Sequence, residues 1–175
     1  AGKWGTGKTT LAALPIRHLI QRRLGTVLAI DADPSSNLHL ALGLPPAHSV
    51  GEIREELLGA VEQGEIGVAV TRYDYLYMQV RMALEEGDSV DLVVMGRPEG
   101  PGCYCAVNHL LRQIVDRLAK AYDYVVIDNE AGMEHLSRRT TEDVNALILV
   151  TDPTVRGINA AKAMAELSRE LAINV

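Results

Sequence analysis

The sequence predicts a three-layer α/β/α domain built on a mostly parallel sheet. Short apolar runs that are typical of buried strands recur along the 175 residues. Longer stretches with the periodicity of amphipathic helices lie between these runs. Because strands and helices alternate, we expect consecutive strands to be parallel and to be covered on both faces. Nearly half of the residues, 47%, are apolar, so a single domain over residues 1–175 can bury a substantial core.

The first predicted helix runs from Lys8 to Arg23. Its apolar residues gather near one face, and Gly25 follows where a helix commonly stops. Pro15 is expected to cost stability or to kink this helix, because proline has no backbone N–H to donate. The apolar run TVLAI at 26–30 then predicts the first buried strand.

A second helix is predicted over residues 50–63. Ser49 stands at the capping position before it, and Glu52 completes the capping-box pattern three residues later. Residues 73–84 are harder to assign, and their pattern favours an extended piece that leads into a helix.

The rest of the chain repeats the alternation of strand and helix. The elements expected there are a strand at 91–95, a loop at 97–102, a helix at 106–121, a strand at 124–127, a short helix at 133–140, a fourth strand at 146–150 and a last helix at 159–171.

Composition excludes several classes of function. The net charge of −6 argues against a nucleic-acid backbone as the main partner, because binding phosphates needs a basic surface. No apolar run approaches the roughly 18 to 20 residues of a membrane span, so no membrane partner is expected. The chain opens without a signal peptide and has only two cysteines, which favours a reducing cytoplasm.

The opening segment, Gly2 to Thr9, fits the pattern G-x-x-x-x-G-K-T of a phosphate-binding P-loop. In such a loop, backbone N–H groups turn around phosphate oxygens, and the following helix points its positive end at the anion. Lys8 would neutralise phosphate charge, and the Thr9 hydroxyl would bind Mg²⁺. The alternative is a chance glycine-rich turn. The residues predicted to hold ATP here are Gly2, Gly5, Thr6, Gly7, Lys8, Thr9 and Thr10.

Lys3 is a second lysine inside this loop, which an ordinary P-loop does not need. It is either a solvated side chain or a group that reaches a phosphate across a dimer interface.

Three aspartates follow predicted strands. Asp31 and Asp33 come directly after TVLAI, and Asp128 follows the strand at 124–127. Since the carboxyl ends of parallel strands face the ligand crevice, these acids are expected to orient water or to lie near Mg²⁺. Gly132 would present its N–H to the terminal phosphate. The alternative is that the acids only cap loops and strand ends. The sequence offers no covalent nucleophile, so hydrolysis would rest on positioning and charge neutralisation.

A P-loop normally follows a strand, and residues 173–175 resemble the start of another strand. We therefore expect a fragment of a P-loop ATPase domain, without its first strand and its C-terminal elements. Such a gap would leave buried backbone groups of the neighbouring strands without partners.

Cys103 and Cys105 lie one residue apart, just before the predicted helix at 106–121. This spacing makes a disulfide between them strained. Two thiolates supply half of the four ligands typical of zinc, and a symmetric dimer would bring four sulfurs together. The alternative is two small buried residues at a helix start.

The chain resembles a known family. Lys3 with Lys8, the Asp31–Pro34 segment and the Asp128–Gly132 segment resemble the deviant Walker A ATPases, the group of MinD, ParA and the nitrogenase iron protein. More narrowly, the segments from Gly96 to Leu111 and from Tyr122 to Thr141 resemble the CooC-type accessory ATPases of carbon monoxide dehydrogenase maturation. The sequence departs from that pattern at Trp4, where the family has glycine.

The resemblance implies an ATP-dependent homodimer that helps to insert nickel into carbon monoxide dehydrogenase. It implies that Lys3 reaches the nucleotide of the partner subunit and that Asp33 positions the attacking water. It also implies that Cys103 and Cys105 of two subunits hold Ni²⁺ or Zn²⁺ between them.

Three other functions stay open. A ParA- or MinD-like positioning ATPase would need a basic surface or an amphipathic tail, and an iron–sulfur electron carrier would need two well-separated cysteines. The third is a metal-binding module whose P-loop is impaired by Trp4.

Overall fold

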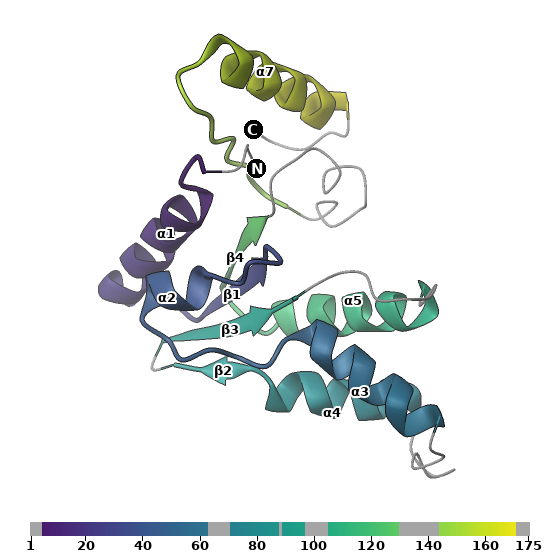
Figure 1. Ribbon diagram of the computed structural model, residues 1–175. Helices are drawn as coiled ribbons and strands as arrows, with labels where there is room; N and C mark the ends of the chain where they lie inside the picture. Colours follow the sequence, from purple (N-terminus) through teal and green to yellow (C-terminus); the bar gives the residue numbers. More distant parts are fainter. Residues whose placement is uncertain (1–4, 63–70, 88, 97–104, 130–143, 171–175) are drawn as a thin grey trace.

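A four-stranded sheet forms the centre of the molecule, with the strand order β2-β3-β1-β4 (Figure 1). The structure is a computed structural model, and it describes residues 5–62, 71–87, 89–96, 105–129 and 144–170. This architecture confirms the predicted α/β/α fold with a mostly parallel sheet.

The parallel part of the sheet has three strands. The central strand, β1 (Val27–Ala32), pairs with β3 (Val90–Val94) on one side and with β4 (Tyr124–Asn129) on the other. A two-residue strand, β2 (Glu85–Glu86), runs antiparallel along the outer edge of β3. The first three predicted strands are therefore confirmed, and β2 was not predicted.

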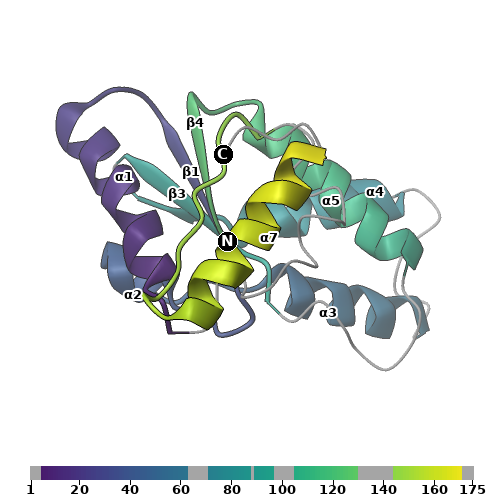
Figure 2. The same ribbon diagram turned by 90° about the horizontal axis from the view of Figure 1, so that it is seen from above.

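Helices cover both faces of this sheet (Figure 2). On one face lie α1 (Lys8–Arg22) and α2 (Leu38–Leu42). On the other lie α3 (Val50–Glu62), α4 (Arg72–Met82) and α5 (Cys105–Ala119). Apolar side chains of the strands alternate between two cores, as the pleat of a sheet requires.

The alternation along β1 decides which residues face the P-loop helix. Val27 and Ala29 pack in the core beneath α1 and α2, whereas Leu28 and Ile30 pack beneath α3, α4 and α5. By the same period of two, the side chain of Asp31 belongs to the α1 face.

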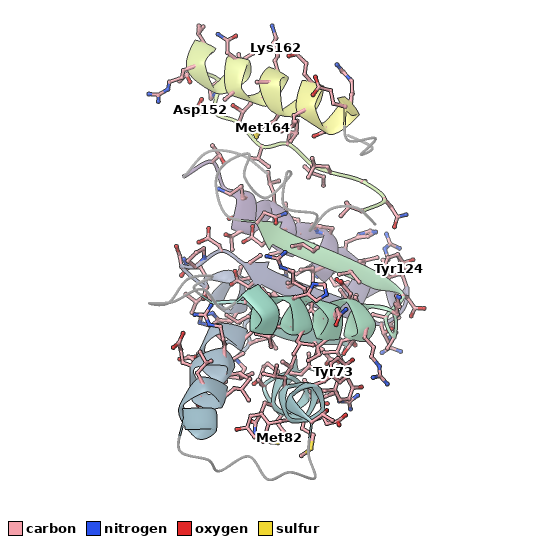
Figure 3. The ribbon with its side chains drawn as sticks, turned by 90° about the vertical axis from the view of Figure 1, so that its right-hand side faces the viewer. Tyr73, Met82, Tyr124, Asp152, Lys162 and Met164 are labelled. Carbon is pink, nitrogen blue, oxygen red and sulfur yellow. The ribbon has the colours of Figure 1, made fainter. Side chains whose placement is uncertain are left out.

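The last helix, α7 (Val155–Glu170), lies apart from the sheet (Figure 1). Met164 points from it toward the preceding segment and packs with Leu147, whereas Lys162 points away and is exposed (Figure 3).

The predicted strand at 146–150 is wrong. Residues 146–149 have no regular secondary structure, and Val150 takes part in only an isolated bridge. A strand needs a neighbour, and in the described part of the chain β4 is paired on one side alone, with β1. Consistent with that open side, Tyr124 and Val125 of β4 are each 39% exposed. The expected absence of a first strand stays a prediction.

Several helix boundaries follow from capping side chains. Ser49 and Glu52 form the predicted capping box: Ser49 N–H donates to Glu52 Oε2 at 2.7 Å, and Glu52 N–H donates to Ser49 Oγ at 3.2 Å. The stretch at 73–84, predicted as an extended piece that leads into a helix, is helical as far as Met82, because Thr71 accepts from Asp74 N–H and starts α4 at Arg72. Ala83 and Leu84 lie beyond the end of the helix. In the same way, Thr154 accepts from Gly157 N–H and starts α7 four residues earlier than predicted.

Helix α1 runs through Pro15, so this proline does not end the helix. The predicted helix at 133–140 lies outside the described residues.

Gly25 offers a test of the loop between α1 and β1. Its φ is +150°, and an added Cβ would lie 2.5 Å from Asp123 Oδ2, the oxygen that accepts bonds from Thr26 N–H and Oγ1–H. We expect Gly25→Ala to lower the free energy of unfolding by about 2 kcal/mol, since it adds both backbone strain and this clash. Chemical denaturation measures the change.

The matched control is Gly59→Ala in α3, where an added Cβ meets nothing within 4 Å. That substitution should stabilise the protein by about 0.5–1 kcal/mol, because alanine is the better helix former. If Gly25→Ala and Gly59→Ala change the free energy of unfolding equally, the loop does not require glycine at position 25.

Candidate functional site

The first turn of α1 has the properties of an anion site. Gly5 and Gly7 adopt left-handed backbone conformations, with φ of +73° and +82°. An added Cβ at either position meets nothing within 4 Å, so the backbone conformation, rather than space, calls for glycine. Gly7, the N-cap residue, has no side chain to cap the helix, and the first turn contains no acidic residue. The positive end of the helix dipole therefore favours a bound anion.

Two buried carboxylates lie side by side opposite this turn. Asp31 of β1 and Asp128 of β4 are partners in the parallel register, and they are 0% and 2% exposed. The hydroxyl of Thr9, the second residue of α1, hydrogen-bonds the carboxylate of Asp128. Strand pairing and the start of α1 thus bring together three predicted site residues from three separate parts of the sequence.

The carboxylate of Asp128 is only partly satisfied. Its Oδ2 atom is buried and has no hydrogen-bond partner among the described residues. Burial raises the pKa of Asp128, and the charge of Asp33 adds to this effect, while the Thr9 bond and the charge of Lys8 oppose it. A carboxylate oxygen beside a threonine hydroxyl is a hard oxygen donor set, which fits Mg²⁺.

Asp31 and Asp33 organise the loop that follows β1. Asp31 Oδ1 accepts from Asp33 N–H at 3.1 Å, and Asp31 Oδ2 accepts from Leu38 N–H at 2.9 Å. Asp33 Oδ1 accepts from Ser35 N–H at 2.8 Å. Burial raises the pKa of Asp31, although the two backbone bonds act in the opposite direction. The loop-capping role considered as the alternative for these acids is thus present in the structure.

The glycine-rich turn, the lysine at the helix start and the strand-end acids together form the arrangement of a P-loop nucleotide site. The family AAA_31, described as an AAA domain, matches residues 1–172. The chain belongs to the AAA_31 family.

Several relatives of this AAA_31 protein are described as ATP-binding proteins. An uncharacterized ATP-binding protein of Methanocaldococcus jannaschii is 50% identical over 173 residues, which are 99% of this chain and 68% of that protein. The carbon monoxide dehydrogenase accessory protein CooC of Rhodospirillum rubrum is 32% identical over 181 residues, covering 98% of this chain and 68% of CooC.

Solved structures show the same fold. A ParA family ATPase from Chlorobium tepidum matches with a TM-score of 0.65 and 21% identity, over 99% of this chain and 67% of that one. MinD of Pyrococcus horikoshii, in complex with Mg-ADP, matches with a TM-score of 0.61 and 19% identity, over 99% of this chain and 64% of that one. This AAA_31 protein therefore has a ParA/MinD-like P-loop ATPase fold, and it spans about two thirds of the relatives that it matches.

The described residues contain only part of the predicted site. Gly5, Thr6, Gly7, Lys8, Thr9 and Thr10 form the start of α1 or precede it directly, and Asp31, Asp33 and Asp128 lie at the strand ends facing it. Of Cys105, only the backbone is described, as the first residue of α5. The remaining predicted site residues lie outside the described ranges: Gly2, Lys3, Cys103 and Gly132. Trp4, where the sequence departs from the family pattern, also lies outside them.

Sequence reasoning missed the link from Asp31 to Leu38. The short helix α2 was not predicted, because five residues are too few to show a helical period. The available signal was the turn-forming stretch Pro34–Asn37 directly before an apolar run.

The described residues include no group of three or more His, Cys, Asp or Glu side chains arranged to hold a metal ion. None of their helices combines the length and the apolar character that crossing a bilayer requires.

Proposed function

We propose that this AAA_31 protein binds ATP with Mg²⁺ and hydrolyses it, as an accessory ATPase for nickel insertion into carbon monoxide dehydrogenase. One observation carries the ATPase part of the proposal. The left-handed glycine turn at the head of α1 faces a buried aspartate, Asp128, whose Oδ2 atom has no partner within the described residues.

Each residue of the site would have a separate task. The backbone N–H groups at the start of α1 and the Lys8 ammonium would bind the phosphates. Thr9 and Asp128 would hold Mg²⁺, which when bound offsets the charge of the phosphate oxygens. Asp33 would orient the attacking water, and Lys3 of the partner subunit would complete the charge neutralisation.

The client and the metal rest on similarity to CooC. The 32% identity extends over nearly the whole chain. Cys105 of the C-x-C pair is the first residue of α5, and Cys103 stands two residues earlier in the sequence. In the proposed homodimer, two such pairs bring four thiolates to one Ni²⁺ or Zn²⁺ ion, which is the cargo of the reaction. Closure of the dimer on ATP would then change the geometry of this thiolate site.

The experiment that tests this proposal is metal analysis of the purified dimer, with and without both cysteines. We expect about one Ni or Zn per two chains in the parent, and almost none in the variant with Cys103→Ala and Cys105→Ala. ATP affinity should be the same in both proteins, because the cradle at the head of α1 is retained.

The control is His109→Ala, which removes an exposed side chain of α5 four residues beyond Cys105 and should leave the metal in place. Metal retained after loss of both cysteines would overturn the proposed metal site. A brown protein with visible absorption would instead indicate an iron–sulfur electron carrier.

A further inference from the structure

We infer that Asp31 is a positioning residue for ATP hydrolysis, which holds Asp33 in place through the backbone of the loop at 33–38. The inference rests on the proposed ATPase function and deepens it. Asp31 would thus act by holding Asp33, and Asp128 rather than Asp31 would contact Mg²⁺.

The first observation is that Asp31 caps a helix from a distance. The N-cap residue of α2, Asn37, makes no side-chain capping bond. Asp31 Oδ2 instead accepts from Leu38 N–H, the first amide of α2, at 2.9 Å and across seven residues. A buried amide left without this partner would cost free energy, so Asp31 fixes the point at which α2 begins.

The second observation is that Asp31 holds both ends of the same loop. Its Oδ1 accepts from Asp33 N–H, and its Oδ2 accepts from Leu38 N–H. Between these ends the loop closes on itself, since Ser36 N–H donates to the Asp33 carbonyl at 2.9 Å and Ser36 has a left-handed φ of +49°. Leu38 is fully buried in the core beneath α1 and α2, which anchors the far end.

The third observation is that Asp31 itself is fixed in the centre of the sheet. It is fully buried in β1, and its carbonyl accepts from Met95 N–H at 2.8 Å, just beyond the end of β3. Asp128 is its register partner in β4. The loop is therefore tied to a strand that is paired on both sides.

The fourth observation separates the roles of the two buried acids. Each oxygen of Asp31 already accepts a backbone hydrogen bond, whereas Asp128 Oδ2 has no partner within the described residues. Asp128 is therefore the better candidate ligand for a metal ion. The contribution of Asp31 is the position of Asp33, and a misplacement of about 1 Å at a reacting group can cost on the order of 100-fold in rate.

The test is Asp31→Asn. The new NH₂ group cannot accept from a backbone N–H, so one of the two bonds is lost while the shape is kept. We expect kcat for ATP hydrolysis to fall about 10- to 100-fold and the affinity for ATP to change by less than about threefold. In the nucleotide-free protein, hydrogen exchange at the Asp33 or Leu38 amide should speed up about tenfold.

The matched control is Asp91→Asn in β3. Asp91 is a half-buried strand aspartate that accepts from the Tyr122 hydroxyl at 2.6 Å, and the proposed mechanism does not use it. Its kcat and the exchange at Asp33 and Leu38 should match the parent.

A second variant distinguishes positioning from simple helix capping. Adding Asn37→Asp to Asp31→Asn supplies a local cap for α2, which should restore stability. If Asp31 positions Asp33, kcat stays low in the double variant; recovery of kcat would overturn the inference.

If Asp31→Asn does not fold, hydrogen exchange in the parent decides: slow exchange at the Asp33 and Leu38 amides supports the inference, and exchange at the rate of an exposed loop overturns it. A parent that hydrolyses ATP, with an unchanged kcat in Asp31→Asn, overturns this inference alone. A parent that neither binds nor hydrolyses ATP overturns the proposed function as well.

Discussion

Replacing Lys8 with alanine is expected to weaken ATP binding by about 100-fold or more. The ammonium of Lys8 stands at the first position of α1, where the helix dipole and the glycine turn already favour an anion. Removing this charge takes away the cation that pairs with the phosphates at the head of α1. Isothermal titration with ATP and Mg²⁺ measures the loss directly.

Lys162→Ala is the control for this substitution. Lys162 lies on the exposed side of α7 and points away from the rest of the molecule (Figure 3). Thermal unfolding of both variants shows whether the fold is retained. If Lys8→Ala binds ATP as well as the parent does, the assignment of the phosphate cradle is wrong.

Asp128→Asn is expected to lower ATPase activity and to raise the stability of the nucleotide-free protein. Loss of the carboxylate should lower Mg²⁺-dependent hydrolysis by about 100-fold or more, because Mg²⁺ loses a charged ligand. The same change should stabilise the nucleotide-free protein by about 1 kcal/mol, since a buried and partly unsatisfied charge is removed. ATPase assays and thermal unfolding, both with and without Mg²⁺, measure the two effects.

The pH dependence of stability follows from the raised pKa of Asp128. Because its pKa is higher in the folded than in the unfolded protein, the folded state binds the proton more tightly. This contribution to stability is therefore complete below the unfolded value of about 3.9, and it is lost as the pH rises through the raised folded value.

Asp128→Asn should remove this contribution, and the loss is measured as a flatter dependence of unfolding temperature on pH. Glu166→Gln, an exposed change on α7, should leave the dependence as in the parent. If Asp128→Asn is less stable than the parent at neutral pH, the account is contradicted.

Local signals in the sequence were enough to predict most of the sheet and the helix that follows the glycine-rich segment. The runs at 26–30, 91–95 and 124–127 correspond to β1, β3 and β4. Short runs of apolar, β-branched residues between helices are typical of parallel strands that are buried on both faces. Ser49 and Glu52 formed their capping box, because that interaction needs only residues three apart.

Features that depend on distant partners could not be predicted in the same way. The run at 146–150 has the composition of a strand, but composition does not say whether a neighbouring strand is present. The roles of Asp31 and Asp128 also look alike in the sequence, since each acid ends a strand. Only the structure shows that the first has both oxygens engaged by backbone amides while the second has a buried oxygen without a partner in the described residues.

The central claim is that the head of α1 and Asp128 together hold a triphosphate with its Mg²⁺. A crystal structure of the protein with Mg²⁺ and a non-hydrolysable ATP analogue tests it most directly. We predict the phosphates on the backbone amides around Gly7 and Lys8, with Mg²⁺ bound to the Thr9 hydroxyl and held by Asp128 directly or through one water. An analogue bound elsewhere, with no ion near Asp128, would contradict the account.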